Sequence, residues 1–254
     1  MHARRLYAHR GAAAERPENT MPAFERAIEI GVDALELDVH VTRDDRLIVA
    51  HDEDGARTAA APLAWASLDL ADARRLDVGW GFVAPDGSRP FAGHGISVPL
   101  FEDVLDAFPK VALNVDIKSD PRAPQLMVDL VKARHAESRV TIASFHYKQV
   151  SAVRRLGYGG ETALAQSEVA TLFALPAVLW KQLPCNGTAA QIPTHAGPLR
   201  FDRAPFIAKC HLLGLRVDFW TIDDREEATR LLALGADGIM TNDPAAIRPV
   251  FASS

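Results

Sequence analysis

Cysteine, long apolar runs and surplus basic residues are all scarce in this sequence. Only two of the 254 residues are cysteines, Cys185 and Cys210, and neither has a third partner at metal-ligand spacing. We expect both to be free and buried in a protein of a reducing compartment, although a single disulfide between them stays open. The longest uncharged apolar run spans residues 169–180, which is too short to cross a bilayer. Because no apolar signal segment follows the basic start of the chain, we expect a cytoplasmic protein without stable membrane insertion.

The charge balance excludes one class of partner. The chain carries 28 Lys and Arg against 33 Asp and Glu, a net charge of −5 with His counted as neutral. A nucleic-acid-binding protein needs a basic surplus for phosphate contacts, so we expect no nucleic-acid partner. With 48% hydrophobic and 24% charged residues, the composition is that of an ordinary globular protein. The length suits one large domain or two small ones and leaves the oligomeric state open.

Strand and helix patterns alternate along the whole chain, which is typical of an α/β fold with mostly parallel strands. The predicted strands cover residues 6–9, 34–41, 47–51, 111–118, 140–145, 162–166, 178–183, 216–222 and 238–241. The predicted helices cover residues 22–30, 71–76, 101–108, 125–135, 149–156, 205–213 and 225–234. Several of these helices end at a glycine just before a strand, as stacked βα units do.

Nine strands are one more than a (β/α)8 barrel needs, and the surplus has a local explanation. Only residues 42–46 join the strands at 34–41 and 47–51, too few for a parallel crossover but enough for a hairpin. Without that hairpin strand, eight remain. We therefore predict a TIM (β/α)8 barrel over residues 1–254 as a single domain, with a small insertion after the second strand at about residues 52–98. A doubly wound open sheet is the alternative, but no glycine-rich phosphate loop follows the first strand.

The strand at residues 34–41 carries the most informative pattern. Side chains alternate faces along a strand, so Glu36, Asp38 and His40 share one face and the apolar residues share the other. Two carboxylates on the inward face of a barrel are costly unless a positive charge lies between them. Carboxylates two residues apart also offer half a site for Mg²⁺ or Ca²⁺. A solvated acidic face explains this strand equally well when it is taken alone.

The same alternation recurs on two later strands, which favours one shared pocket. Asn114, Asp116 and Lys118 lie on one face of the strand at 111–118. Asp218 and Trp220 share a face in the same way. Asp116 supplies a third carboxylate for a cation site, and Lys118 supplies a positive charge for an anionic substrate.

Two histidines end predicted strands, on the side of a barrel where active sites form. His9 closes the first strand and His51 closes the hairpin strand. Histidine gains and loses a proton near neutral pH, so the pair can serve as general acid and base. Arg10 adds a fixed positive fork for phosphate oxygens, and Asp52 can orient the ring of His51. A lone histidine at a strand end is more often an ordinary surface residue, and we place the remaining histidines in that class.

Several short motifs follow one another along nearly the whole chain. They are His9-Arg10-Gly11, Pro17-Glu18-Asn19-Thr20, Glu36-Leu37-Asp38-Val39, His51-Asp52, Val98-Pro99-Leu100, Asn114-Val115-Asp116-Ile117-Lys118, Phe219-Trp220-Thr221-Ile222-Asp223 and Gly235-Ala236-Asp237-Gly238-Ile239-Met240-Thr241. In this order they resemble the signatures of the glycerophosphodiester phosphodiesterase family. Each motif is weak by itself, whereas the ordered set is specific.

The resemblance implies a TIM barrel that hydrolyses a small-molecule glycerophosphodiester to glycerol 3-phosphate and an alcohol. It also implies a divalent metal cation, Mg²⁺ or Ca²⁺, as the cofactor. The family's site residues match metal ligands Glu36, Asp38 and Asp116, catalytic residues His9 and His51, and substrate-binding residues Arg10, Lys118 and Trp220.

The chain departs from the family pattern at two positions. Asp116 stands where the family more often has the longer glutamate, and Asn242 stands where an acidic residue is common. Residues 183–199 match no motif, and we expect them to shape the pocket for the leaving group. Two other functions compete with the first. One is a lysophospholipase D that uses the same site on a membrane lipid; the other is a catalytically silent barrel that binds a phosphorylated ligand.

Overall fold

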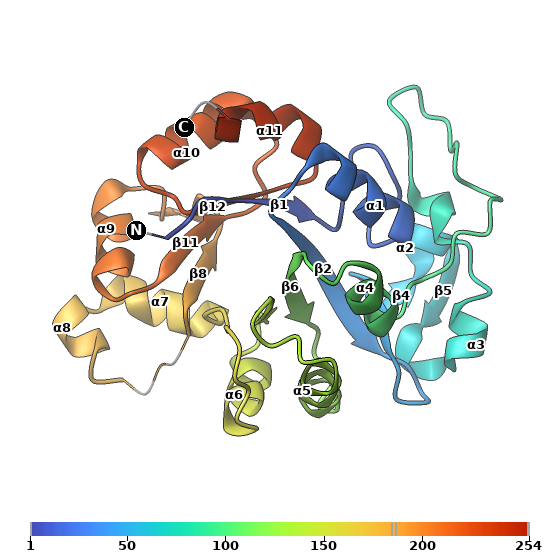
Figure 1. The fold of residues 1–254 in the computed structure, drawn as a ribbon, viewed down its shortest axis with the longest axis horizontal. Coiled ribbons are helices and arrows are strands. Elements are labelled where there is room, and N and C mark those ends of the chain that lie inside the picture. The colour runs from blue at the N-terminus through green and yellow to red at the C-terminus, as the bar shows by residue number, and fades with distance from the viewer. Residues whose placement is uncertain (1, 184, 186, 253–254) are drawn as a thin grey trace.

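The computed structural model describes residues 2–183, 185 and 187–252 and shows a parallel barrel surrounded by helices (Figure 1). Seven parallel strands of the described chain follow one another around the barrel in sequence order. They are β1 (Arg5–His9), β2 (Ala34–Val41), β6 (Ala112–Ile117), β7 (Val140–Ala143), β8 (Ala189–Ile192), β11 (Arg216–Phe219) and β12 (Gly238–Thr241). The last strand pairs with the first, so the sheet curls back on itself.

Two single parallel bridges close the ring between β7 and β8. Ile142 of β7 pairs with Thr162, and Ala163 pairs with Ala189 of β8. The strand predicted at residues 162–166 is therefore reduced to Thr162 and Ala163, which occupy the eighth strand position of the barrel. The predicted TIM (β/α)8 barrel is confirmed.

The strand predicted at residues 178–183 is wrong. Residues 166–180 instead form α7 (Gln166–Ala174) and α8 (Ala177–Trp180), and Trp180 packs into the apolar core. The barrel strand expected there lies further along the chain, at β8. Its sequence, Ala-Ala-Gln-Ile, has little intrinsic strand propensity. Pairing along its whole length with β11 holds β8 in place, so tertiary contacts override local preference.

The predicted hairpin is confirmed, and the extra segment begins after it. β3 (Leu47–Val49) pairs antiparallel with β2, with Val41 opposite Leu47. Residues 52–98 then form β4 (Asp54–Gly55), α2 (Ala56–Ala59), β5 (Ala61–Ala64), the 3₁₀ turn η1 (Trp65–Ser67), α3 (Leu70–Ala73) and the 3₁₀ turn η2 (Val78–Gly81). Trp65, fully buried, packs with Ile48 of β3 in a small apolar core, which fixes this segment beside the barrel.

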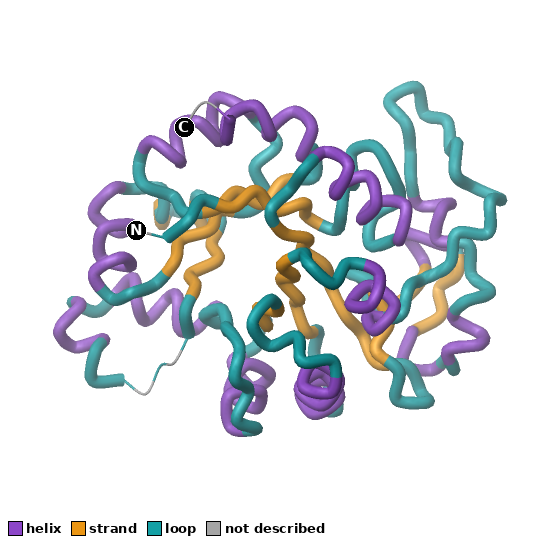
Figure 2. The backbone as a smooth tube through the Cα atoms, viewed as in Figure 1, coloured by secondary structure: helices purple, strands orange, loops and turns teal. Residues whose placement is uncertain are grey.

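The remaining helices cover the outside of the barrel (Figure 2). They are α1 (Met21–Ile30), α4 (Phe101–Ala107), α5 (Ala123–Ala133), α6 (Tyr147–Arg155), α9 (Ala204–Leu212), α10 (Arg225–Ala233) and α11 (Pro244–Ala252). A short hairpin of β9 (His195–Ala196) and β10 (Leu199–Arg200) precedes α9. The sequence predicts no helix at α2, α7, α8 or α11, whereas the predicted helices match α1, α3, α4, α5, α6, α9 and α10 within a few residues.

α1 shows how the sequence sets a helix and frees the inner face of a strand. Thr20 caps it by accepting a hydrogen bond from Ala23 N, and Gly31 ends it in a left-handed conformation with φ +88°. Phe24 of α1 packs on the outward side chains of β2, among them Leu35 and Leu37. Because those apolar residues face the helices, the alternate residues of β2 face into the barrel.

Within the part of the chain that the structure describes, no helix has both the length and the apolar character needed to cross a membrane.

Candidate active site

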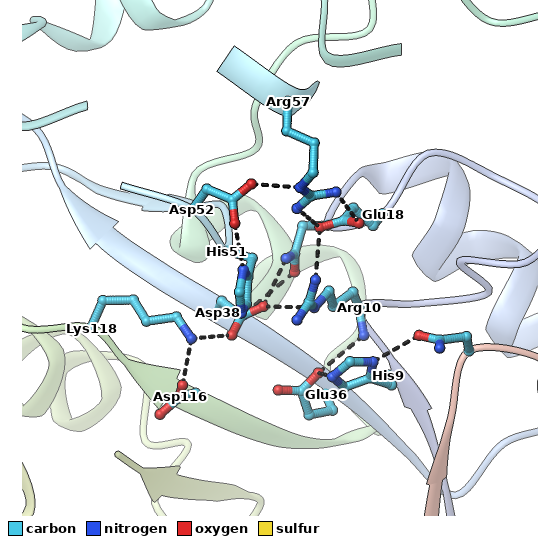
Figure 3. A network of polar contacts seen from close by, with 12 residues as sticks. His9, Arg10, Glu18, Glu36, Asp38, His51, Asp52, Arg57, Asp116 and Lys118 are labelled. Carbon is cyan, nitrogen blue, oxygen red and sulfur yellow. Dashed lines mark hydrogen bonds and ion pairs between the residues drawn. The ribbon is translucent and has the colours of Figure 1, made fainter. Parts of the chain in front are cut away.

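Every predicted site residue lies on one pocket of about 440 Å³ inside the barrel mouth. Glu36 and Asp38 come from β2, and Asp116 and Lys118 come from the end of β6 and the residue after it. His9 ends β1, Arg10 follows it, His51 follows the hairpin strand, and Trp220 follows β11. The polar members of this set contact one another in one network, which His51 joins only through Asp52, Arg57 and Glu18 (Figure 3).

Strand register brings the carboxylates together. The parallel pairing of β2 with β6 sets Asp38 beside Asp116 and Glu36 beside Asn114, and the pairing of β1 with β2 sets His9 beside Glu36. All three carboxylates are buried. Burial and the neighbouring Asp38 raise the pKa of Glu36 well above its usual range. Burial likewise raises the pKa of Asp116 to about 6, so the group is short of positive charge.

Lys118 lies between two of these carboxylates. Its Nζ is 2.7 Å from Asp38 Oδ1 and 2.6 Å from Asp116 Oδ2. Burial acts to lower the pKa of Lys118, but the two carboxylates outweigh it and raise that pKa. Burial also acts to raise the pKa of Asp38, and Lys118 and Arg10 outweigh it and lower that pKa. With the ammonium between them, no three His, Cys, Asp or Glu side chains of the described residues converge as a ready-made metal site.

The carboxylates nevertheless suit a hard divalent cation by their chemistry. Mg²⁺ and Ca²⁺ prefer carboxylate oxygens, and three such groups lie on two adjacent strands here. The raised pKa values of Glu36 and Asp116 indicate negative charge that Lys118 and Arg10 leave uncompensated. A cation that replaces a proton in this group would relieve that deficit.

His9 is held by a chain of two hydrogen bonds that fixes its tautomer. Its Nδ1 lies 2.8 Å from Asn242 Oδ1, while Asn242 Nδ2 donates to Asp223 Oδ2 at 2.8 Å. An ionised carboxylate only accepts, so the amide nitrogen must face Asp223 and the amide oxygen must face His9. Nδ1 of His9 therefore carries the proton, and its Nε2, 3.9 Å from Glu36 Oε2, is free to accept one. Burial lowers the pKa of His9, and Arg10 lowers it further.

His51 has a charged partner instead. Its Nδ1 lies 2.7 Å from Asp52 Oδ1, so the prediction that Asp52 orients this ring is confirmed. The second oxygen of Asp52 accepts from Arg57 Nε at 2.6 Å. His40, on the same face of β2 as Asp38, donates from Nε2 to the backbone carbonyl of His51 at 3.0 Å and so supports the turn that carries His51.

Arg10 stands on a tight turn that only a left-handed backbone makes possible. Arg10 and Gly11 have φ of 56° and 84°, and a Cβ on Gly11 would lie 2.7 Å from Ala23 Cβ. The turn lets Arg10 N donate to Glu36 Oε2 at 3.0 Å while its Nη1 donates to Glu18 Oε1 at 3.0 Å. The buried Nε of Arg10 has no well-aligned acceptor, although Asp38 Oδ2 lies 3.3 Å away.

The opposite wall of the pocket is apolar. It is lined by Phe145, Leu164, Val169, Ile192, Phe201 and Trp220, among others. The rings of Phe145 and Trp220 meet edge to face with centroids 5.5 Å apart, which holds the Trp220 side chain at the rim. Between the two walls, Gln191 of β8 donates to Asn114 Oδ1 at 2.8 Å.

Several residues of the site carry no role in the sequence-based prediction. Glu18 and Asn242 belong to or adjoin recognised motifs, yet the motifs do not say which side chains they hold. Arg57 and Gln191 lie in segments that match no motif. The structure connects Asn242 to His9, Glu18 to Arg10, Arg57 to Asp52 beside His51, and Gln191 to Asn114.

Comparisons with known proteins agree with this geometry. Residues 9–246 match the model of the glycerophosphoryl diester phosphodiesterase family. A glycerophosphodiester phosphodiesterase of Caldanaerobacter subterraneus subsp. tengcongensis is 30% identical over 246 residues, which cover 94% of each chain. The crystal structure of such a domain from Mycobacterium tuberculosis has a TM-score of 0.86 at 18% identity and covers 99% of this chain and 100% of that one. An Oleispira antarctica phosphodiesterase, solved in complex with the product sn-glycerol-3-phosphate, has a TM-score of 0.78 at 18% identity, with 98% and 97% covered.

Proposed function

The chain belongs to the glycerophosphoryl diester phosphodiesterase family of phosphoric diester hydrolases, and we propose that it hydrolyses glycerophosphodiesters to glycerol 3-phosphate and an alcohol. One observation carries the proposal. A single pocket holds three buried carboxylates, two basic side chains and two histidines with differently charged partners. Phosphodiester cleavage needs each of these, because charge develops on the phosphoryl oxygens while one proton leaves the nucleophile and another reaches the departing alkoxide.

Glu36, Asp38 and Asp116 would hold a divalent cation in this enzyme. When bound, such a cation supplies Lewis acidity toward a phosphoryl oxygen and lowers the pKa of a bound hydroxyl group or water. Asp116 is one methylene shorter than glutamate, and the strand register places it level with Asp38, one of the other two proposed ligands.

The partners of the two histidines favour a division of roles between them. His9 faces a neutral amide, and burial lowers its pKa, so the neutral ring with a free Nε2 fits a general base. His51 Nδ1 lies against the Asp52 carboxylate, which holds the ring in one orientation, as a general acid requires. We infer that His9 accepts the proton of the nucleophile and that His51 protonates the leaving alkoxide.

Two basic residues and one aromatic residue would bind the substrate. Arg10 and Lys118 line the pocket on its carboxylate side, where their positive charges can interact with phosphoryl oxygens. Trp220 lies on the apolar wall, which fits the carbon atoms of the glycerol or of the leaving alcohol. Residues 192–201, including Ile192 and Phe201, contribute to that wall, which supports the expectation that part of the segment 183–199 shapes the leaving-group side.

The test is a panel of glycerophosphodiesters with different alcohols, assayed with Mg²⁺, Ca²⁺ and Mn²⁺ in turn and with a chelator. We expect release of glycerol 3-phosphate that the chelator abolishes. His9→Ala and His51→Ala should lose this activity while remaining folded, and His94→Ala, an exposed residue of the segment 52–98, should keep it. Full activity in either of the first two variants would overturn the roles assigned to them.

A lysophospholipid in the same panel separates the alternative substrate class. Preferential turnover of the lysolipid over every soluble diester would favour the lysophospholipase D function. Absence of turnover with every cation, together with tight binding of glycerol 3-phosphate, would favour a catalytically silent barrel.

A further inference from the structure

Arg57 places one guanidinium between two carboxylates of different loops. It lies in α2, within the segment 52–98, and its side chain is about half exposed. Its Nη1 and Nη2 donate to the two oxygens of Glu18 at 2.7 and 2.6 Å. Its Nε donates to Asp52 Oδ2 at 2.6 Å. The guanidinium of Arg57 thus binds both carboxylate oxygens of Glu18 and one of Asp52 at the same time.

Each of these carboxylates also holds a residue of the active site. The second oxygen of Asp52 lies 2.7 Å from His51 Nδ1, and Glu18 Oε1 also accepts from Arg10 Nη1 at 3.0 Å. The contacts form an unbroken path from His51 through Asp52, Arg57 and Glu18 to Arg10 (Figure 3). The path joins a proton-transfer group to a phosphate-binding group without passing through the metal-binding carboxylates.

Arg57 acts on the electrostatics of both carboxylates as well as on their position. Burial acts to raise the pKa of Glu18 and of Asp52. Arg57, together with Arg10 at Glu18 and with His51 at Asp52, outweighs burial and lowers each pKa. Both carboxylates therefore stay ionised and accept hydrogen bonds from His51 and Arg10. A lysine could not reproduce this arrangement, because its point charge lacks the fork that meets both oxygens of Glu18 and one of Asp52.

We propose that Arg57 is a positioning residue that sets the orientation of His51 and of Arg10 together, so that the segment 52–98 is part of the catalytic apparatus. This inference rests on the proposed function, because it assigns a proton transfer to His51 and phosphate binding to Arg10. Arg57 itself contacts neither substrate nor the reacting atoms.

The first test compares Arg57→Gln and Arg57→Lys with Arg43→Gln. Arg43 is a matched control because it also forms a two-pronged ion pair with a carboxylate of the same segment, Asp69, at 2.8 and 2.5 Å, away from the pocket. We expect Arg57→Gln to lower kcat by about tenfold or more and to raise KM by about threefold or more, since each lost charged hydrogen bond releases one site residue. Arg57→Lys should recover part of either loss, and Arg43→Gln should change neither constant.

A second measurement separates positioning from a general effect on folding. Asp52→Asn should lower mainly kcat and Glu18→Gln should raise mainly KM, because the first acts through His51 and the second through Arg10. Adding Arg57→Gln to the Asp52→Asn/Glu18→Gln double variant should then change either constant by less than about twofold, since the groups it holds are already gone. Guanidinium at tens of millimolar should restore part of kcat to Arg57→Ala and none to Asp52→Asn.

Two distinct failures are separable in this design. A wild-type protein that turns over no glycerophosphodiester with any cation overturns the proposed function. An active wild type together with a folded Arg57→Gln variant whose kcat and KM both stay within about twofold overturns the role of Arg57 alone. Full additivity of Arg57→Gln with the double variant overturns it as well.

Discussion

Replacing Asn242 with alanine removes the acceptor that fixes the ring of His9. Asn242 Oδ1 lies 2.8 Å from His9 Nδ1, and Asp223 holds the amide from its other end. The ring is largely buried, so its Nδ1–H would lose its partner, which costs about 1–3 kcal/mol. In the proposed mechanism, His9 Nε2 takes up a proton in the transition state. If the whole cost falls there, kcat/KM should fall by about 5- to 150-fold.

The same variant should also move the pH profile, and the direction can be derived. Burial and Arg10 lower the pKa of His9, whereas the hydrogen bond with Asn242 raises it. Removing Asn242 therefore lowers the pKa of His9 further. A general base loses activity when it becomes protonated, so the acid limb of kcat/KM should shift to lower pH. The assay is hydrolysis of glycerophosphocholine between about pH 5 and pH 9, where a histidine titrates.

A neighbouring residue supplies the control. Asp243 accepts a hydrogen bond from Ala246 N at 2.9 Å in the first turn of α11 and does not contact His9. Asp243→Ala should lower stability by about 1 kcal/mol, as the loss of a helix cap does, and leave kcat/KM unchanged. A folded Asn242→Ala variant with kcat/KM within about twofold of the wild type would refute the reasoning.

Three further predictions follow from burial and backbone geometry. Glu36→Gln keeps the side-chain shape and removes a carboxyl group whose pKa is raised by burial. We therefore expect calorimetry of the metal-free variant to give a higher melting temperature and the assay to show loss of hydrolysis. A lower melting temperature would contradict this. Gly11→Ala puts a methyl group 2.7 Å from Ala23 Cβ in a residue with φ +84°. Urea unfolding should show that the free energy of unfolding falls by about 2–4 kcal/mol. A fall of less than about 1 kcal/mol would contradict the predicted clash. Cys185 and Cys210 are both free as predicted, but only Cys210 is buried and Cys185 is half-buried. Burial raises their thiol pKa values to about 11 and to about 12, so alkylation by iodoacetamide should be slow near pH 8 and rise about tenfold per pH unit; fast labelling at pH 8 would contradict the raised pKa values.

The inner face of the barrel is predictable from sequence because a strand has a period of two. Glu36 and Asp38 on β2, and Asn114 and Asp116 on β6, alternate with apolar residues that pack on the helices. Parallel pairing then brings equivalent positions level with one another, so three carboxylates predicted on two strands meet in one pocket. Local periodicity is enough for this part of the site.

Local sequence does not predict two of the barrel strands, the short one between β7 and β8 and β8 itself. Thr162 and Ala163 each make a single bridge, too little pairing for a strand signal of their own. β8 contains two alanines and the inward Gln191, whereas residues 177–180 are apolar and look more like a buried strand. That apolar segment packs as a helix outside the barrel because β8 already occupies the strand position. Only tertiary pairing with β11 selects β8 for that position.

The residues that hold the catalytic groups escape prediction for a different reason. Asn242 and Asp223 come from two loops near the C-terminus and act on His9 near the N-terminus. Arg57 reaches Glu18 across a sequence separation of 39 residues. Hydrogen bonds of this kind depend on side-chain reach between loops and leave no period in the sequence.

The charges of the pocket residues give a physical reason why the divalent cation should bind before the substrate. Three buried carboxylates face Arg10 and Lys118, which leaves the inner site one positive charge short, and the raised pKa of Glu36 indicates where a proton makes up the deficit. A divalent cation bound to the carboxylates would turn that shortage into a surplus of one, which the single negative charge of a phosphodiester then neutralises. Entry of the cation must displace a proton, so metal binding should tighten as pH rises. A chain of net charge −5 would thus present a positive pocket to an anionic substrate only in its metal-loaded form.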